Sequence, residues 1–301
     1  MAKEVQMSQR MDVHEQITNR IIEAIEKGAG EFKLPWHRPA ASLQRPANIQ
    51  SGKPYNGINV VTLWVEAQLK NYATPVWGTY KQFQEKGCQV RKGEKASLIV
   101  FYKELEYARE EPQAGEDDTR SVWMARGYWV FNAEQTDGFT PVERPPVQPI
   151  ERNARVDAWI ANVGADIRYG GHSAYYRPSD DYIQMPDLGV FTGTDTTSAT
   201  EAMYATLLHE HAHLTGHKSR LDRFSGSRST ESTAREELLA ELSAAFLCAD
   251  LGVTPHLRDD HAQYIQHWLE VMKGDKKAIF QAAAGANRAV EWLNARQPET
   301  P

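Results

Sequence analysis

The chain has little cysteine and no CxxC pair. Cys88 and Cys248 are its two cysteines, and they lie far apart in the sequence. This excludes a cysteine-ligated zinc finger and indicates a reducing compartment, where thiols stay free. The N-terminal residues lack the apolar core of a signal peptide, and no apolar run has the length of a membrane span. We therefore expect a cytoplasmic protein with no membrane partner.

The overall composition shows no strong bias. Hydrophobic residues make up 41% and charged residues 25% of the chain, as in an ordinary globular protein. The formal net charge of -6 argues against a chain that binds nucleic acid along its whole length. With 301 residues, the chain is long enough that we expect two domains.

A proline-rich segment divides the chain. Residues 141–152 contain four prolines, which exclude a helix interior or a central strand, so we interpret this segment as a linker between domains 1–140 and 153–301. The acidic segment 109–120 is expected to be an exposed hairpin loop. Apolar spacing predicts helices at 12–27, 56–72, 75–87, 151–162, 199–215 and 234–250, with more helix to about 294. Short strands are expected at 97–103, 122–132, 165–169, 173–176 and 181–185. The fold class is therefore α+β.

The sharpest motif is an HExxH formed by His209, Glu210 and His213. On a helix, the two histidines lie one turn apart on the same face. Both imidazoles can then reach one metal ion, with the glutamate beside them. The motif predicts a metal site on a helix.

Capping signals support the helices around this motif. Ser198 and Glu201 form the S-x-x-E pattern of a capping box, and Gly216 stands where a helix end favours glycine. Thr233 and Glu236 form a second capping box, which predicts the start of the next helix.

A catalytic zinc site has three protein ligands and leaves one position for water, so a third ligand is needed. Our candidate is Glu237, which follows His213 by 24 residues on the helix predicted at 234–250. Glu236 competes for this role, but helical facing favours Glu237. Glu241, one turn further along the same face, is placed to accept the spare N–H of a ligand histidine.

The other histidines receive weaker interpretations. His217 partly imitates the third ligand of the metzincin pattern, but that pattern requires histidine where this chain has Ser219, so we reject the class. We interpret His211 and His217 as surface histidines or as supports of the metal ligands. No role is assigned to His172, His256, His261 and His267.

The motif predicts a metallopeptidase with Zn²⁺, although Mn²⁺ or another divalent metal would suit similar ligands. Glu210 would take a proton from water and pass it to the leaving amine. A group that stabilises the oxyanion is expected, but no pattern identifies it. The strand at 181–185 is our candidate for an edge strand that binds an extended peptide.

The N-terminal half is locally basic. Residues 33–103 contain eleven lysines and arginines against three acids, with aromatic residues between them. Single-stranded nucleic acid binding requires cations for the phosphates and rings that stack on unpaired bases. Many of these rings would equally pack in the core of any α+β domain. The candidate DNA contacts are Trp36, Lys53, Tyr55, Trp77, Tyr80, Lys81, Arg91, Lys92 and Lys95.

Several motifs follow one another between about residue 12 and residue 270: WHRP, SGKPYNGIN, TYKQ, VRKGEK, YWVFNAEQTDG, a proline-rich link, HEHAHLTGHKSRLDR and EELLAE. This order resembles the ArdC-type antirestriction proteins of conjugative plasmids. The resemblance implies a small mixed α/β domain that binds single-stranded DNA, followed by a zincin-like metallopeptidase domain with a small sheet and the HExxH helix. It maps the metal ligands to His209, His213 and Glu237, with Glu210 as acid/base.

The resemblance also implies that the protein protects incoming plasmid DNA from host restriction. A protein of the restriction system is then a candidate peptide substrate. Two other functions stay open. One is a protein that coats single strands and has a structural or inactive metal site. The other is a cytosolic metallopeptidase without a DNA role.

Overall fold

The computed structural model describes residues 12–29, 43–108, 119–140, 149–193, 197–224, 229–255 and 261–298. Trp36 and His256 lie outside the described residues. So do most of the acidic segment, 109–118, and most of the proline-rich segment, 141–148.

The N-terminal half is built on a four-stranded sheet with the order β1-β2-β5-β4. β1 and β2 are parallel, and the other pairs are antiparallel. A separate pair of short strands, β3 and β6, lies beside helix α3. The strands are β1 (Ala47–Asn48), β2 (Val76–Gly78), β3 (Gln89–Val90), β4 (Ser97–Ala108), β5 (Thr119–Asn132) and β6 (Thr136–Asp137). The helices are α1 (Val13–Ala29), α2 (Ile58–Lys70) and α3 (Tyr80–Glu85).

The helix predicted at 75–87 is wrong in its first part. Val76–Gly78 pairs on both sides as strand β2, and the helix begins only at Tyr80. Thr79 sets this boundary, because its hydroxyl accepts from the N–H of Gln82 while the Gln82 side chain accepts from the N–H of Thr79.

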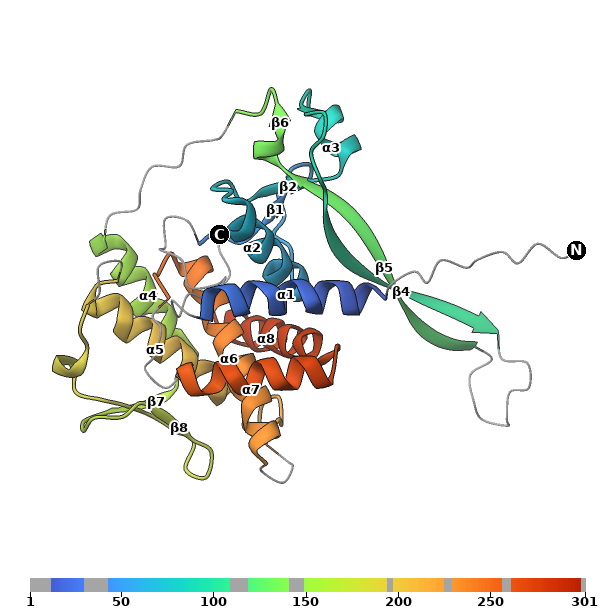
Figure 1. Ribbon diagram of the computed structural model, residues 1–301. Coiled ribbons are helices and arrows are strands. Elements are labelled where there is room, and N and C mark those ends of the chain that lie inside the picture. The colour runs from blue at the N-terminus through green and yellow to red at the C-terminus, as the bar shows by residue number, and fades with distance from the viewer. Residues whose placement is uncertain are drawn as a thin grey trace, which may run out of the picture.

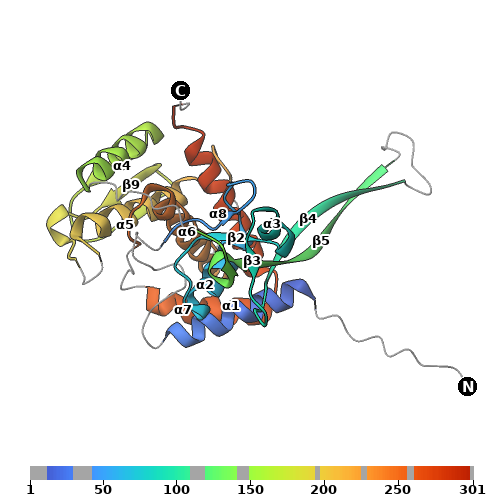
Figure 2. The same cartoon turned by 90° about the horizontal axis from the view of Figure 1, so that it is seen from above.

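β4 and β5 form a hairpin longer than the sequence predicted. The two strands pair continuously from Ser97 opposite Val130 to Ala108 opposite Thr119. Its base packs on α2 and α1, and its far end projects away from the rest of the molecule (Figures 1 and 2).

The C-terminal half consists of helices around α6 and a small sheet with the order β7-β9-β8. α4 begins at Pro149, in the predicted linker, because the first turn of a helix needs no N–H from that residue. The helices are α4 (Pro149–Val163), α5 (Ala199–Leu214), α6 (Thr230–Leu251), α7 (His261–Gly274) and α8 (Ala278–Asn294). The strands are β7 (Asp166–Tyr169), β8 (Tyr175–Arg177) and β9 (Tyr182–Met185).

The prediction of an edge strand at 181–185 is wrong. β9 is the central strand, parallel to β7 and antiparallel to β8, so both of its edges are occupied. β8 pairs only with β9 among the described residues, which makes it an edge strand of this sheet.

The two halves share one apolar core. A continuous cluster of buried side chains extends from Ile17 on α1 to Leu293 on α8. The ring of Trp64 on α2 lies 5.7 Å from that of Phe246 on α6, between centroids. Helix α8 contacts both α2 and α6, so it belongs structurally to both halves. None of the described helices combines the length and the apolar content needed to cross a membrane.

Candidate metal centre

The HExxH motif lies on α5, which begins as predicted. The Ser198 hydroxyl accepts from the N–H of Glu201, and the Glu201 carboxylate accepts from the N–H of Ser198. The second oxygen of Glu201 accepts from the hydroxyl of Thr254 at 2.9 Å, which ties the start of α5 to the segment after α6. α5 is therefore held at one end by a local cap and a tertiary bond.

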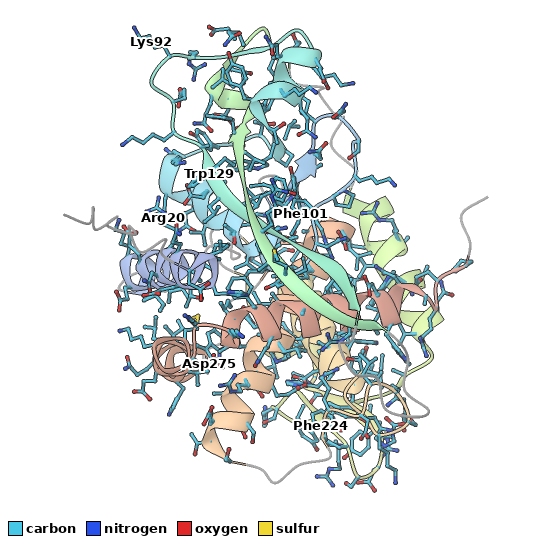
Figure 3. The ribbon with its side chains drawn as sticks, turned by 90° about the vertical axis from the view of Figure 1, so that its right-hand side faces the viewer. Arg20, Lys92, Phe101, Trp129, Phe224 and Asp275 are labelled. Carbon is cyan, nitrogen blue, oxygen red and sulfur yellow. The ribbon has the colours of Figure 1, made fainter. Side chains whose placement is uncertain are left out.

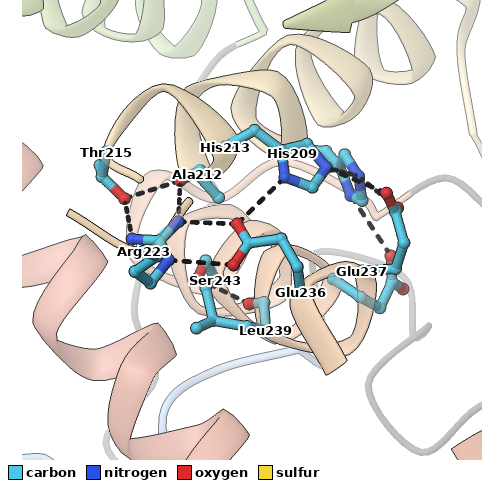
Figure 4. A network of polar contacts seen from close by, with 10 residues as sticks. His209, Ala212, His213, Thr215, Arg223, Glu236, Glu237, Leu239 and Ser243 are labelled. Carbon is cyan, nitrogen blue, oxygen red and sulfur yellow. Dashed lines mark hydrogen bonds and ion pairs between the residues drawn. The ribbon is translucent and has the colours of Figure 1, made fainter. Parts of the chain in front are cut away.

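His209, His213 and Glu237 converge as the sequence indicated (Figure 4). The two Nε2 atoms lie 3.1 Å apart, and the Glu237 carboxylate oxygens lie 3.4 Å from His209 Nε2 and 3.5 Å from His213 Nε2. Two ligand atoms about 2.05 Å from one ion lie roughly 3.3 Å apart in a tetrahedron. The donor set and its spacing therefore fit a divalent metal ion.

Charge is concentrated in this cluster. Burial lowers the pKa of His213, but the carboxylates of Glu236 and Glu237 outweigh burial and raise it to about 10. Burial raises the pKa of Glu237, but hydrogen bonds from His209 and His213 hold it far below its ordinary value. A proton on His213 thus balances the carboxylates, and a bound metal ion would replace that proton.

Glu236 supports His213 instead of competing for the metal. Its carboxylate accepts from His213 Nδ1 at 3.2 Å, on the side of the ring away from the ligand nitrogen. Arg223 donates to both oxygens of Glu236, at 3.0 and 2.8 Å, and also to the carbonyl of Ala212 and the hydroxyl of Thr215 (Figure 4). Arg223 was missed by the sequence patterns, because it reaches the site from a loop without fixed spacing.

The second predicted capping box is wrong, and this explains the role of Glu236. α6 begins at Thr230, where Ser229 and Ser232 cap each other, so Thr233 and Glu236 lie inside the helix. The Glu236 side chain is therefore not used at a helix start and is available to His213.

Glu241 lies one turn beyond Glu237, on the Nδ1 side of His209. Its carboxylate is 3.7 Å from that nitrogen, which is longer than a hydrogen bond. Its side chain is buried, so it contributes negative charge close to the ligand histidine.

Gly216 directly follows Thr215, the C-cap of α5. The predicted reason for a glycine at this helix end is wrong. Its φ is not positive, so no left-handed conformation requires glycine there. A Cβ at this position would lie 2.6 Å from the ring of Phe224. Gly216 is needed because the loop carrying Arg223 and Phe224 packs directly against it.

The interpretation of His211 as a surface or supporting residue is wrong. Its side chain is fully buried, its Nδ1–H donates to the carbonyl of Leu207, and burial lowers its pKa to about 4. It packs edge-on against Trp159 in the core, outside the ligand cluster. His217 bonds to Ser219 and is also outside that cluster, in accord with rejection of the metzincin pattern.

A cavity of about 590 Å³ opens beside the ligands. Glu210 is almost completely buried and lines this cavity together with His213. The edge strand β8 contributes Tyr175 and Tyr176 to the lining of the same cavity. The cavity thus joins the ligand cluster, the predicted acid/base and a strand edge.

The predicted DNA contacts fall into different environments. Trp77 is only 1% exposed because its ring lies in the apolar core, edge-on to Tyr72, so its role in this structure is packing and the stacking prediction is corrected. Arg91 is bound to the backbone of Glu134 and Thr136 and to the side chain of Glu94, which indicates a structural role. Arg91 is nevertheless exposed, as are Lys53, Tyr80, Lys81, Lys92 and Lys95.

Tyr55 is buried, but its ring lines a second, larger cleft. Rings outside the candidate set are more accessible. Phe101, Tyr102 and Trp129 on the hairpin are 49%, 44% and 57% exposed, and Figure 3 shows the positions of Phe101 and Trp129. Because aromatic residues alternate over both faces of this hairpin, the sequence does not reveal which rings face solvent.

The chain is similar to known proteins over both of its halves. Residues 154–285 match a family described as a zincin-like metallopeptidase, and residues 11–131 match the N-terminal domain of the anti-restriction factor ArdC. The metal-free crystal structure of antirestriction protein ArdC from plasmid R388 is 41% identical, with a TM-score of 0.77 over 95% of this chain and 97% of that one. Its Mn(II)-bound structure is 39% identical, with a TM-score of 0.76 over 96% and 100% of the two chains.

Two relatives extend the comparison. The uncharacterized protein y4eC of Sinorhizobium fredii is 42% identical over 96% of this chain and 93% of its own length. The DNA primase TraC of Escherichia coli is 36% identical over 93% of this chain, which spans 27% of TraC.

The fold and the site define a two-domain α+β protein whose second domain is a zincin-like metallopeptidase domain with a ligand set for a divalent metal. The first domain is that of an antirestriction factor. The chain belongs to the ArdC antirestriction family.

Proposed function

We propose that this protein binds single-stranded DNA and cleaves peptide bonds in the cytoplasm, and thereby protects incoming plasmid DNA from host restriction during conjugation. The observation that carries the peptidase proposal is that Glu210, the ligand cluster and an edge strand meet at one cavity. A site that only stabilised the fold would need neither the cavity nor the additional carboxylate.

His209, His213 and Glu237 would hold Zn²⁺, or Mn²⁺ as in the relative from plasmid R388. A bound divalent ion lowers the pKa of a water molecule and polarises a substrate carbonyl. Glu210 would take a proton from the attacking water and deliver it to the leaving amine. The roles of Glu236 and Arg223 are to hold the ring of His213 in place.

The edge strand β8 is the element we assign to substrate binding. Among the described residues it pairs only with β9, so its other edge has main-chain groups available for an extended peptide. Tyr175 and Tyr176 on this strand line the cavity. A protein of the restriction system is our candidate substrate.

A DNA partner is supported by the locally basic N-terminal half and by the relatives. One relative is an antirestriction protein and another is a DNA primase. Exposed cations and rings on the first domain are the groups that single-stranded DNA requires.

The test is the substitution Glu210→Gln, which keeps the side-chain volume but removes the proton acceptor. We expect peptide hydrolysis to fall by roughly a hundredfold or more, with metal affinity and DNA binding retained. Plasmid transfer into restricting and non-restricting recipients then measures protection. If E210Q protects as well as the wild type does, the peptidase has no part in protection, and a protein that coats single strands is the better description.

A further inference from the structure

A cleft of about 1320 Å³ lies between the first domain and helix α8. The chain has 40 aspartates and glutamates, but none lines this cleft among the described residues. Three cations do line it: Lys53 from the loop after β1, and Lys277 and Arg288 from the start and middle of α8. No carboxylate in the described part of the chain pairs with their side chains.

Rings and amides occupy the rest of the wall. Phe101 and Tyr102 are half exposed, whereas Tyr55 and Phe280 are buried beneath the surface of the cleft. An amide side chain can both donate and accept, which suits the edge of a nucleobase. Asn56 is the lining amide whose side chain has no bond within the described part of the chain. The others already bond to protein groups: Asn48, Gln50, Asn59, Gln82, Gln281 and Asn287.

We propose that this cleft, shared by both domains, binds single-stranded DNA. The proposal rests on the proposed DNA-binding function and assigns it a site. Phosphates lie against Lys53, Lys277 and Arg288, and unpaired bases stack on Phe101 and Tyr102. Paired bases of a duplex cannot reach these rings, because their faces are covered by neighbouring base pairs.

The position of α8 makes the cleft a joint property of the two domains. A Cβ on Gly57, which has a φ of +55°, would lie 3.9 Å from the carbonyl of Ala283, so the loop of the first domain lies close to the α8 backbone. On its other side α8 packs tightly on α6, where a Cβ on Gly285 would lie 2.4 Å from Leu239. The same helix therefore contacts the DNA cleft and the helix that carries Glu237.

One residue borders both cavities. Gln281 lines the DNA cleft and the cavity of the metal site, and its side-chain oxygen accepts from Arg235 at 3.2 Å. A DNA strand bound in the cleft would therefore lie next to the wall of the cavity at the metal site. DNA affinity consequently depends on residues of the metallopeptidase domain, which a site confined to the first domain would not show.

The experiment measures binding of the full chain to a fluorescein-labelled oligo-dT of about 20 nucleotides, by anisotropy across a salt series. We expect Arg288→Glu to weaken binding roughly tenfold and to reduce the slope of log affinity against log salt by about 0.7. Phe101→Ala should weaken it roughly five- to a hundredfold, and Phe101→Tyr should restore it. Lys218→Glu, an exposed reversal of the same charge outside the cleft, is the matched control and should bind like the wild type.

The melting temperature of each variant shows whether it is folded. If Arg288→Glu does not fold, Lys277→Glu replaces it as the variant at the α8 side of the cleft. If the folded α8 variants and Phe101→Ala bind oligo-dT with the affinity of the wild type, the proposal that the cleft is the DNA-binding site is refuted. Weakening by Lys92→Glu alone would overturn it as well and place the DNA at the turn before β4. Failure of the wild type to bind oligo-dT at low salt would instead refute DNA binding itself.

Discussion

The support of His213 by Glu236 gives the sharpest prediction. The Glu236 carboxylate accepts from His213 Nδ1 at 3.2 Å and from two nitrogens of Arg223 at 3.0 and 2.8 Å, with its side chain 17% exposed. Glu236→Gln keeps the shape but removes the charge. We expect the Kd for Mn²⁺ to rise by about 10- to 100-fold, because the ligand ring loses its anchor.

This magnitude agrees with an independent estimate. A 10- to 100-fold change corresponds to about 1.4–2.7 kcal/mol. One hydrogen bond to a charged group contributes about 1.5–3 kcal/mol, and the substitution weakens one such bond to His213. Arg223→Lys should have a smaller effect in the same direction, since an ammonium group cannot bond to both carboxylate oxygens as a guanidinium does.

The assay is titration of the metal-free protein with Mn²⁺, followed by the electron paramagnetic resonance signal of the free ion. Glu231→Gln is the matched control, because Glu231 lies on the same helix with its side chain 63% exposed. Glu237→Gln should abolish measurable binding. If Glu236→Gln binds Mn²⁺ within twofold of the wild type while Glu237→Gln does not bind, the reasoning about the support of His213 is refuted.

Three further predictions concern stability, each measured by urea unfolding of the metal-free chain. Ser198→Ala removes the cap of α5 and should lower the free energy of unfolding by about 1 kcal/mol; no change would show that the cap is redundant. Gly216→Ala places a Cβ 2.6 Å from an aromatic ring and should cost about 1–3 kcal/mol, whereas wild-type stability would mean that the loop moves freely. Burial raises the pKa of Glu66, but hydrogen bonds from Arg20 and Lys70 hold it below its ordinary value of 4.5. A carboxyl group whose pKa is lower in the folded than in the unfolded state stabilises the fold at pH values above its unfolded pKa. The stabilisation from Glu66 is therefore complete at neutral pH and is lost as the pH falls through the folded pKa. The stability gap between the wild type and Glu66→Gln should therefore be largest near pH 7 and close as the pH falls; a constant gap would contradict the assignment.

The convergence of the candidate metal ligands was predictable because it depends on local rules. His209 and His213 share a helix face through their spacing alone, and the chemistry of a third ligand selects Glu237 on the next helix. The Ser198–Glu201 cap was equally local, since both of its bonds span three residues. The separation into a basic, aromatic first half and a metal-site half also follows from residue composition and motif order alone.

The sequence-based predictions were wrong where one local pattern was compatible with two structures. The pair Thr233 and Glu236 satisfies the capping rule, but Ser229 and Ser232 satisfy it four residues earlier, and packing against α5 and α8 favours the longer helix. The strand at 182–185 has the composition of any short strand, and its central position follows only from pairing with partners on both sides.

The burial of individual aromatic rings and histidines could not be predicted from the sequence. Trp77 and Phe101 lie in similar basic and aromatic surroundings along the chain, yet one is in the core and the other is half exposed. His211 lies between two candidate metal ligands in the sequence, but its position on the helix points its side chain into the core. Exposure is set by the sum of contacts from distant elements, which no local spacing encodes.

Local rules in the sequence were enough to predict the candidate metal ligands, the acid/base candidate and the two-domain α+β class, because helical periodicity and ligand chemistry act over a few residues. Tertiary packing brought Arg223 to Glu236, made β8 an edge strand of its sheet among the described residues, and joined Lys53 with Arg288 in one cleft. Lys53 and Arg288 are more than 200 residues apart in the chain. Their proximity results from the packing of α8 against both domains in a single core, and such packing is decided by shape and buried area over the whole molecule.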